Sequence, residues 1–224
     1  MLWSDFTQLS GAILLIVGAL LPVVNPPGDA PLFLRMTAGC DEQTRAMLAR
    51  RIAVYSFALL LGSMLIGSFV LRLFELSVAV VQVAGGAVVC SLGWKLLNDD
   101  AKPPEIASDP QRASLAAMGR AFFPLTMPLT VDPGVMSVAV TIGANHAHTL
   151  GTALIQVVAG IIGAAIVALS ILLTYRYAES FAQRIGHRGM MIVLRLSAFI
   201  VLSIGVQIAW NGIKTLLREV GVHA

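Results

Sequence analysis

Two acidic residues, Asp29 and Asp132, lie inside long apolar stretches of this 224-residue chain, whereas the other acids lie between such stretches. Each belongs to a short run rich in proline and glycine, PVVNPPGDAP at 22–31 and PLTVDPG at 128–134. An ionisable group at membrane depth is costly and by default marks a solute or ion site. We expect these carboxylates to serve the ammonium group of a solute, a sodium ion or a proton.

The residue directly before a proline is biased away from helical geometry. Here those residues are Asn25, before Pro26, and Asp132, before Pro133. Asparagine and aspartate are strong helix N-caps, and proline is favoured at the first helical position. Each run therefore predicts a helix that stops and restarts inside an apolar stretch.

A restarted helix presents unpaired N–H groups and the positive end of its dipole, which suits a carboxylate or another small anion. Gly28 and Gly134 follow the two prolines and let the backbone bend or a ligand approach. Within a bilayer, irregular backbone survives only where it is buried in protein or lines a wet cavity. The two interruptions are therefore expected to build one polar site near the membrane midplane.

Simpler interpretations of the same residues stay open. Proline kinks occur in membrane helices for packing alone. Asp132 is alternatively only the cap of its own helix. Asp29 lies in the first turn of a helix that starts near Asn25, where the dipole tolerates a negative charge without any function.

Further polar side chains lie within the apolar segments. Thr126 and Thr130 flank Pro128, where their hydroxyls can satisfy carbonyls that the proline leaves free. Gln207 and Asn211 are four residues apart on one helix face, and Gln82 lies in another segment. Hydrogen bonding between helices is the simpler role for these amides. The candidate substrate-binding residues are Asn25, Pro26, Gly28, Asp29, Gln82, Thr126, Thr130, Asp132, Pro133, Gly134, Gln207 and Asn211.

The composition identifies the elements that must hold these residues. Hydrophobic residues make up 57% of the chain and charged residues 12%, with a mean hydropathy of +0.84, whereas soluble domains carry about 25% charge. This predicts an all-α, polytopic membrane protein. The net charge of +3, with basic residues between apolar segments, argues against a nucleic-acid partner. Neither cysteine suggests a metal site, and no catalytic motif occurs, so we expect no enzyme.

Six membrane segments are predicted, since a spanning helix needs about 20 apolar residues. In chain order they are 9–24 with 30–38, 52–71, 76–97, 115–130 with 135–144, 149–174 and 190–217. Twelve Lys and Arg residues lie on the side of the loops after segments one, three and five, and three lie on the other side. Positive charge stays cytoplasmic, so both termini are expected on the outer, periplasmic side of a bacterial cytoplasmic membrane.

The order interrupted, plain, plain occurs twice, in residues 1–98 and 113–224, which are joined by a polar, proline-rich linker at 99–112. Three crossings is an odd number, so the second three-helix repeat must insert upside down relative to the first. Interrupted helices at corresponding positions of two inverted repeats are the best sequence pointer to the binding site of a secondary transporter.

Four stretches together resemble the MarC family of bacterial integral membrane proteins: LLPVVNPPGDAPLFL (20–34), QVAGGAVVCSLGWKLL (82–97), AFFPLTMPLTVDPG (121–134) and GVQIAWNGI (205–213). The resemblance runs in order over nearly the full length. It implies a relation to the LysE-type amino-acid exporters and a small neutral amino acid, such as glycine or alanine, as the solute. The family usually has glycine where this chain has Asp132, whose carboxylate would compete with a solute's own carboxylate for the helix end.

These observations predict a secondary transporter or exporter that moves a small solute by alternating access, with the solute held at the paired half-helix ends. No cofactor is expected beyond a coupling ion, either a proton or sodium. Membrane lipid surrounds the chain, and assembly into a homo-oligomer stays open. Two alternatives remain: a channel or lipid-handling protein with a permanent hydrated path, and a membrane subunit that binds a partner without transport.

Overall fold

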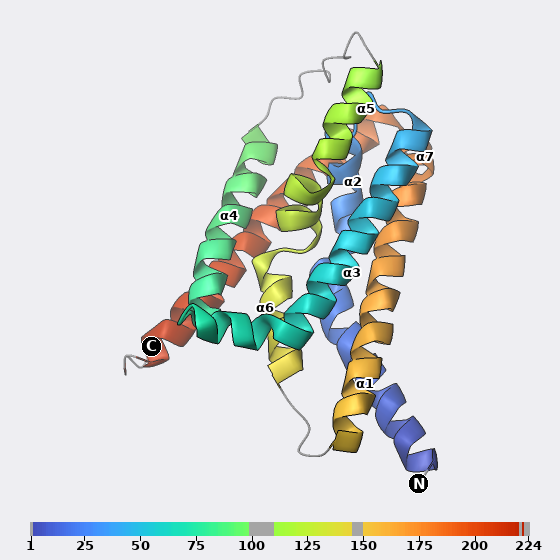
Figure 1. Cartoon of the computed structure of the whole chain (residues 1–224). Coiled ribbons are helices and arrows are strands. Elements are labelled where there is room, and N and C mark those ends of the chain that lie inside the picture. The colour runs from blue at the N-terminus through green and yellow to red at the C-terminus, as the bar shows by residue number, and fades with distance from the viewer. Residues whose placement is uncertain (1, 99–109, 145–149, 220, 222–224) are drawn as a thin grey trace.

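The computed structural model describes residues 2–98, 110–144, 150–219 and 221, and every element in these ranges is a helix (Figure 1). The elements are α1 (Leu2–Val24), α2 (Pro26–Met36), α3 (Glu42–Leu73), α4 (Val78–Asn98), α5 (Pro110–Gly119), the π-helix η1 (Ala121–Thr130), α6 (Pro133–Ala144) and α7 (Leu150–Glu219). The predicted all-α class is confirmed. Most of the predicted linker at 99–112 lies outside the described residues.

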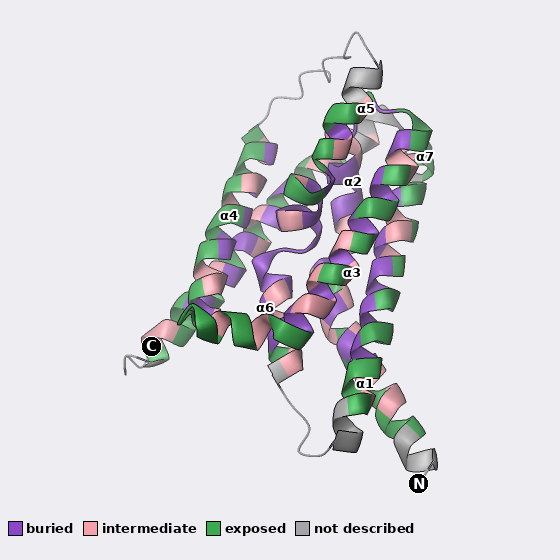
Figure 2. Ribbon diagram, in the orientation of Figure 1, coloured by how far each residue is buried: buried purple, intermediate pink, exposed green. Residues whose placement is uncertain are grey.

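Five helices in the described ranges are long and apolar enough to cross a membrane, and a sixth span results if the bent pair η1 and α6 is counted as one. The five are Phe6–Val24, Glu42–Leu73, Val78–Asn98, Leu154–Arg184 and Met191–Arg218. Large apolar residues such as Phe69, Trp94 and Phe199 are exposed. Exposed residues run along these helices (Figure 2). Extended apolar surface of this kind suits contact with lipid. The chain is therefore a multi-pass membrane protein.

The chain runs back and forth between two ends of the molecule (Figure 1). In that view α1 and α2 run upward, α3 returns, α4 runs upward, and α5, η1 and α6 return. The last two spans, Leu154–Arg184 and Met191–Arg218, confirm the two segments that the sequence predicts there, although α7 is helical throughout its 70 residues. The helix bends back on itself between these spans, because they run in opposite directions (Figure 1). The first half of α7 rises and the second half descends, so the start of α1 and the end of α7 lie at the same end.

α4 packs against the second half of α7 through glycines. A Cβ on Gly86 of α4 would lie 2.5 Å from the backbone nitrogen of Ala209. Gly93 and, on α7, Gly205 and Gly212 make similarly close approaches to the backbone of the facing helix. Small residues let membrane helices approach closely enough for van der Waals packing, which has to hold helices together where lipid supplies no hydrophobic drive. This close pair forms one wall of the molecule's interior.

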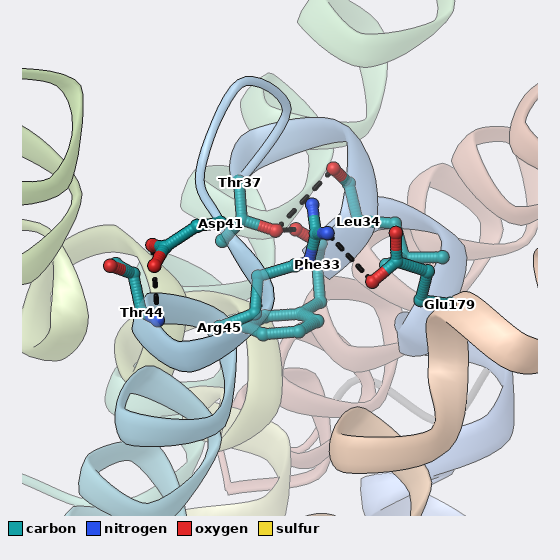
Figure 3. A network of polar contacts seen from close by, with 7 residues as sticks. All are labelled: Phe33, Leu34, Thr37, Asp41, Thr44, Arg45 and Glu179. Atoms are coloured by element: carbon teal, nitrogen blue, oxygen red, sulfur yellow. Dashed lines mark hydrogen bonds and ion pairs between the residues drawn. The ribbon is translucent and has the colours of Figure 1, made fainter. Parts of the chain in front are cut away.

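Polar contacts tie the turn between α2 and α3 to α7 (Figure 3). Asp41 caps α3, because its carboxylate accepts a hydrogen bond from the backbone N–H of Thr44 at 3.2 Å. Hydrogen bonding by Thr44 lowers the pKa of the Asp41 carboxyl below its usual range. One turn further along α3, Arg45 Nη2 donates to Glu179 Oε2 of α7 at 2.6 Å. The start of α3 is thus fixed beside the first half of α7.

Candidate functional site

The first interruption separates α1 from α2 at Asn25. This residue has the left-handed backbone conformation (φ 44°, ψ 56°), which asparagine tolerates better than most residues. Its side chain makes no capping hydrogen bond, in contrast to the cap that the sequence predicts. The carboxamide instead lies over Gly28, where a Cβ would collide with Asn25 Nδ2. Glycine at position 28 therefore leaves the space that the carboxamide occupies.

The first turn of α2 has no unpaired N–H group. Pro26 and Pro27 carry no N–H, and the N–H groups of Gly28 and Asp29 both donate to the carbonyl of Asn25, at 2.9 and 3.3 Å. An anion would need such unpaired groups to bind at a helix start. The expectation that this helix end holds a carboxylate through its backbone is therefore not met in the described conformation.

The same prolines leave carbonyl oxygens unpaired at the end of α1. A helical carbonyl accepts from the N–H four residues ahead, which Pro26 and Pro27 lack, and the N–H of Gly28 bonds to Asn25 instead. The carbonyls left without a helical partner are those of Pro22, Val23 and Val24. Such carbonyls point along the helix axis past its last turn. They make the first interruption electronegative.

The second interruption lies between η1 and α6, whose axes differ by 72°. Pro124 and Pro128 lie within η1 and disturb its hydrogen bonding. The hydroxyls of Thr126 and Thr130 donate to carbonyls five residues earlier, each at 2.7 Å. These threonines therefore take the carbonyl-satisfying role that the sequence suggests for them.

Asp132 caps α6. Its Oδ1 accepts a hydrogen bond from the backbone N–H of Val135 at 2.7 Å, and the residue is only 8% exposed. Pro133 and Gly134 are buried beside it, and a Cβ on Gly134 would lie 2.5 Å from Ile208 Cδ1. Asp132 therefore does cap its own helix. Its own carboxylate, rather than a solute, binds the N–H of Val135 at the start of α6.

The two interruptions border one small cavity of about 20 Å³, enough for one water molecule. Its lining consists of Val23, Val24, Asn25, Asp29, Val89, Pro128, Leu129, Thr130, Asp132, Val201 and Ile204. Asp29 is 7% exposed, and within the described ranges no hydrogen bond reaches its carboxylate or the carboxamide of Asn25. The lining contains no Lys, Arg or His. A buried acid without a hydrogen bond or a cation is costly, so Asp29 calls for a ligand.

Tyr175 of α7 is a neighbour of this site that sequence reasoning missed. It is 2% exposed, and its ring stacks on that of Phe33 from α2 with centroids 4.6 Å apart. Its hydroxyl lies 2.8 Å from Thr130 Oγ1, and donates to it because the threonine hydrogen is used on a carbonyl. Tyr175 directly follows the predicted segment 149–174, a position where interfacial tyrosines are common. The position of Tyr175 in the sequence therefore indicated a residue at the membrane surface rather than one beside the buried site.

Three predicted site residues lie away from the cavity. Gln82 Nε2 of α4 donates to Ser137 Oγ of α6 at 3.0 Å, which is the interhelical role considered for it. Gln207 Nε2 donates to Asn211 Oδ1 at 2.8 Å, and both side chains are exposed on α7. The predicted residues that line the cavity are Asn25, Asp29, Thr130 and Asp132, and those that flank it in the chain are Pro26, Gly28, Thr126, Pro133 and Gly134.

A larger cavity of about 280 Å³ lies between α3, α4 and α6. Its lining is almost wholly apolar, with Ser63 and Ser137 as the polar exceptions. It has no charged group to bind an ion or a zwitterion. Hydrocarbon suits such a surface, so we place the polar site at the smaller cavity.

Known proteins resemble this chain over almost its whole length. The MarC family of integral membrane proteins matches residues 10–217. The membrane protein YvbG of Bacillus subtilis (strain 168) is 28% identical over 199 residues, which cover 88% of this chain and 91% of that protein. The inner membrane protein MarC of Salmonella paratyphi A is 28% identical over 217 residues, which cover 94% and 98% of the two chains. No solved structure matches.

The extent of these matches agrees with the fold. The matched residues 10–217 include both interruptions and all five candidate spans for most of their length. The first interruption and the second fall well inside this range. The chain belongs to the MarC family of integral membrane proteins.

Proposed function

We propose that the chain is a secondary transporter or exporter of the cytoplasmic (inner) membrane, which moves a small solute by alternating access around the cavity between its two interruptions. The observation that carries the proposal is that Asn25 and Asp29, from one half of the chain, and Asp132, from the other, line one cavity. Acids at membrane depth mark solute and ion pathways. The name inner membrane protein MarC, given to relatives, supports the location.

The proposed architecture is a pair of inverted three-helix repeats, residues 1–98 and 113–224, each beginning with a segment interrupted near the midplane. The matched lengths of the restarted helices support it, at 11 residues for α2 and 12 for α6. So does the position of both chain ends at one end of the molecule (Figure 1). The bias of twelve basic residues against three supports placing both ends on the outer side.

The proposed solute is a small zwitterion, a neutral amino acid such as alanine or glycine. The carboxamide of Asn25 offers donors to a carboxylate, and Asp29 offers negative charge to an ammonium group or a coupling cation. The cavity of about 20 Å³ holds no more than a water molecule. The solute therefore requires the cavity to open toward one side at a time, which favours alternating access over a permanently open channel.

Flux through purified protein in liposomes tests this proposal. We expect labelled alanine or glycine to exchange against unlabelled amino acid, with saturation and counterflow that an open pore does not show. Asp132→Gly, which restores the residue usual in the family, should alter the ion dependence of exchange more than the stability of the fold. Absence of exchange across a broad panel of amino acids would reject the solute. Copurification of another protein without any flux would favour the partner-subunit alternative.

A further inference from the structure

The lining of the cavity at the two interruptions presents oxygen atoms and no unpaired donor from the backbone starts of α2 and α6. The carboxylate of Asp29 is buried and receives no hydrogen bond from any described residue. The unpaired carbonyls at the end of α1 belong partly to Val23 and Val24, which line the same cavity. Asp132 adds a second carboxylate, of which one oxygen is used by the N–H of Val135. Apart from the carboxamide of Asn25, which also offers donors, this set of groups suits a cation.

The net charge at the cavity is strongly negative. At the first interruption the negative dipole end of α1 lies next to the positive dipole end of α2. At the second, the end of η1 lies next to the start of α6. The opposite partial charges of the helix dipoles therefore largely cancel at both places. About two negative charges then remain from Asp29 and Asp132, and no basic side chain lines the cavity to offset them. Two uncompensated carboxylates in such a place would be very costly, so they must either take up a proton or be accompanied by a metal cation.

The chemistry of the lining selects the kind of cation. Carboxylate and carbonyl oxygens are the ligands of hard cations such as sodium, calcium and magnesium. No group of three or more His, Cys, Asp or Glu side chains occurs within the described ranges, so a transition metal has no matching set of ligands there. A proton would need only one carboxylate oxygen and would leave the carbonyls at the end of α1 unexplained. In membrane transporters, unwound carbonyls and half-helix ends of this kind coordinate a coupling ion.

We propose that the cavity between the two interruptions binds one sodium ion, held by the carboxylates of Asp29 and Asp132 and by the backbone carbonyls at the end of α1. The choice of a monovalent ion rests on the proposed function. Sodium leaves about one negative charge at the site, which matches the ammonium group of a zwitterionic solute. A divalent ion would neutralise both carboxylates and leave nothing to attract that group. Sodium is therefore the coupling ion of this transporter.

Equilibrium binding of radiolabelled sodium to the purified full-length chain in detergent tests the site directly, without any amino acid present. We expect saturable binding that potassium, choline and calcium do not displace at equal ionic strength. The midpoint of thermal unfolding should rise steadily with the logarithm of sodium concentration, and it should not respond to potassium or choline. An equal response to potassium, or stronger stabilisation by calcium than by sodium, would overturn the proposal.

Three variants assign the ion to its ligands. Asp29→Asn should weaken sodium binding by at least about tenfold, since changing even an outer-shell partner of a metal ligand costs that much. Asp132→Asn keeps the oxygen that caps α6 and should therefore fold, yet bind sodium more weakly. Glu42→Gln removes an exposed acid at the start of α3 and should bind like the original chain. If Asp29→Asn does not fold, the site is tested instead by the comparison of sodium with potassium and choline and by the Asp132→Asn variant. Unchanged sodium binding in Asp132→Asn would refute the site.

The same experiments separate the ion site from the transport proposal. Sodium binding without amino-acid exchange in liposomes would leave the site standing and reject the proposed solute. Amino-acid exchange that proceeds equally in sodium-free and sodium-containing buffer would leave transport standing and reject the sodium site.

Discussion

Gly86→Ala tests how closely α4 and α7 are packed. The variant adds one Cβ on the buried face of α4, where the nearest atoms are the backbone nitrogen of Ala209 at 2.5 Å and the carbonyl oxygen of Gly205 at 2.7 Å. Ordinary van der Waals contact begins at 3.4 Å, so the backbone of α7 has to retreat by the difference of about 0.9 Å. Because these atoms belong to a helix backbone, no side-chain rotation can relieve the collision.

The expected cost follows from that displacement. Inserting an extra carbon into a well-packed interior costs about 1–3 kcal/mol, and the retreat of α7 also loosens the contacts of Gly93 and Gly212. Against this, replacing glycine by alanine inside a helix gains roughly 1 kcal/mol in propensity. Gly18→Ala in α1 provides the matched control, because a Cβ there meets no atom within 4 Å and the residue is exposed. Subtracting the two variants cancels the propensity gain and leaves the collision alone.

Thermal unfolding of both variants in the same detergent measures this difference. For a chain of this size, 1 kcal/mol corresponds to a shift of about 2–4 °C in Tm. Gly86→Ala should therefore unfold about 2–12 °C below Gly18→Ala. Equal Tm values for the two variants would refute the close approach of α4 and α7 described above.

Three further outcomes are expected. Tyr175→Phe keeps the stacking on Phe33 but loses the hydrogen bond to Thr130. In a denaturant titration it should lower the free energy of unfolding by about 0.5–1.5 kcal/mol. A loss as large as that caused by Tyr175→Ala would contradict this. Asp132→Ala removes the cap of α6 and should lower the free energy of unfolding by about 0.5–2 kcal/mol. Asp132→Asn keeps a capping oxygen, so its free energy of unfolding should lie within a few tenths of a kcal/mol of the original chain's. Thermal unfolding of both variants measures the difference. The pKa of Asp41 is lowered by hydrogen bonding from Thr44, so its stabilisation of α3 is present above the usual aspartate range and is lost as pH falls through the lowered value. The protection of amides at the start of α3 against hydrogen exchange, relative to their intrinsic rates at each pH, should therefore fall at low pH, and Asp41→Asn should remove this loss of protection.

The sequence predicts helix boundaries at Asn25 and Asp132 because the effect of proline is local. A residue before proline is biased away from the helical region, and α2 and α6 do begin at Pro26 and Pro133. The bias is not absolute, because Pro22 and Pro31 lie inside α1 and α2. The hydroxyl bonds of Thr126 follow from the same short-range chemistry. The two spans within α7 are likewise predicted from the apolar stretches on either side of the more polar residues 175–190.

Features that depend on long-range packing could not be predicted in this way. α7 is apolar on most of its surface, so its sequence does not say which face turns inward, and Gln207 with Asn211 lies on the outer side. Tyr175 reaches Thr130 only because the first half of α7 packs against η1 and α2. The pairing of N–H groups at the start of α2 depends on the left-handed conformation of Asn25, which a proline does not require.

The two consecutive prolines after Asn25 have a lasting consequence for how this molecule can move. Pro26 and Pro27 have no N–H whatever the arrangement of α1 and α2, so no change of the angle between these helices can form the missing hydrogen bonds across the junction. The carbonyl oxygens of Pro22, Val23 and Val24 therefore lack their helical partners in any arrangement of the two helices. The junction of η1 with α6, which is bent by 72°, has one proline at the start of the following helix instead of two. We therefore expect a change of angle between helices to occur at this junction more readily than at Asn25.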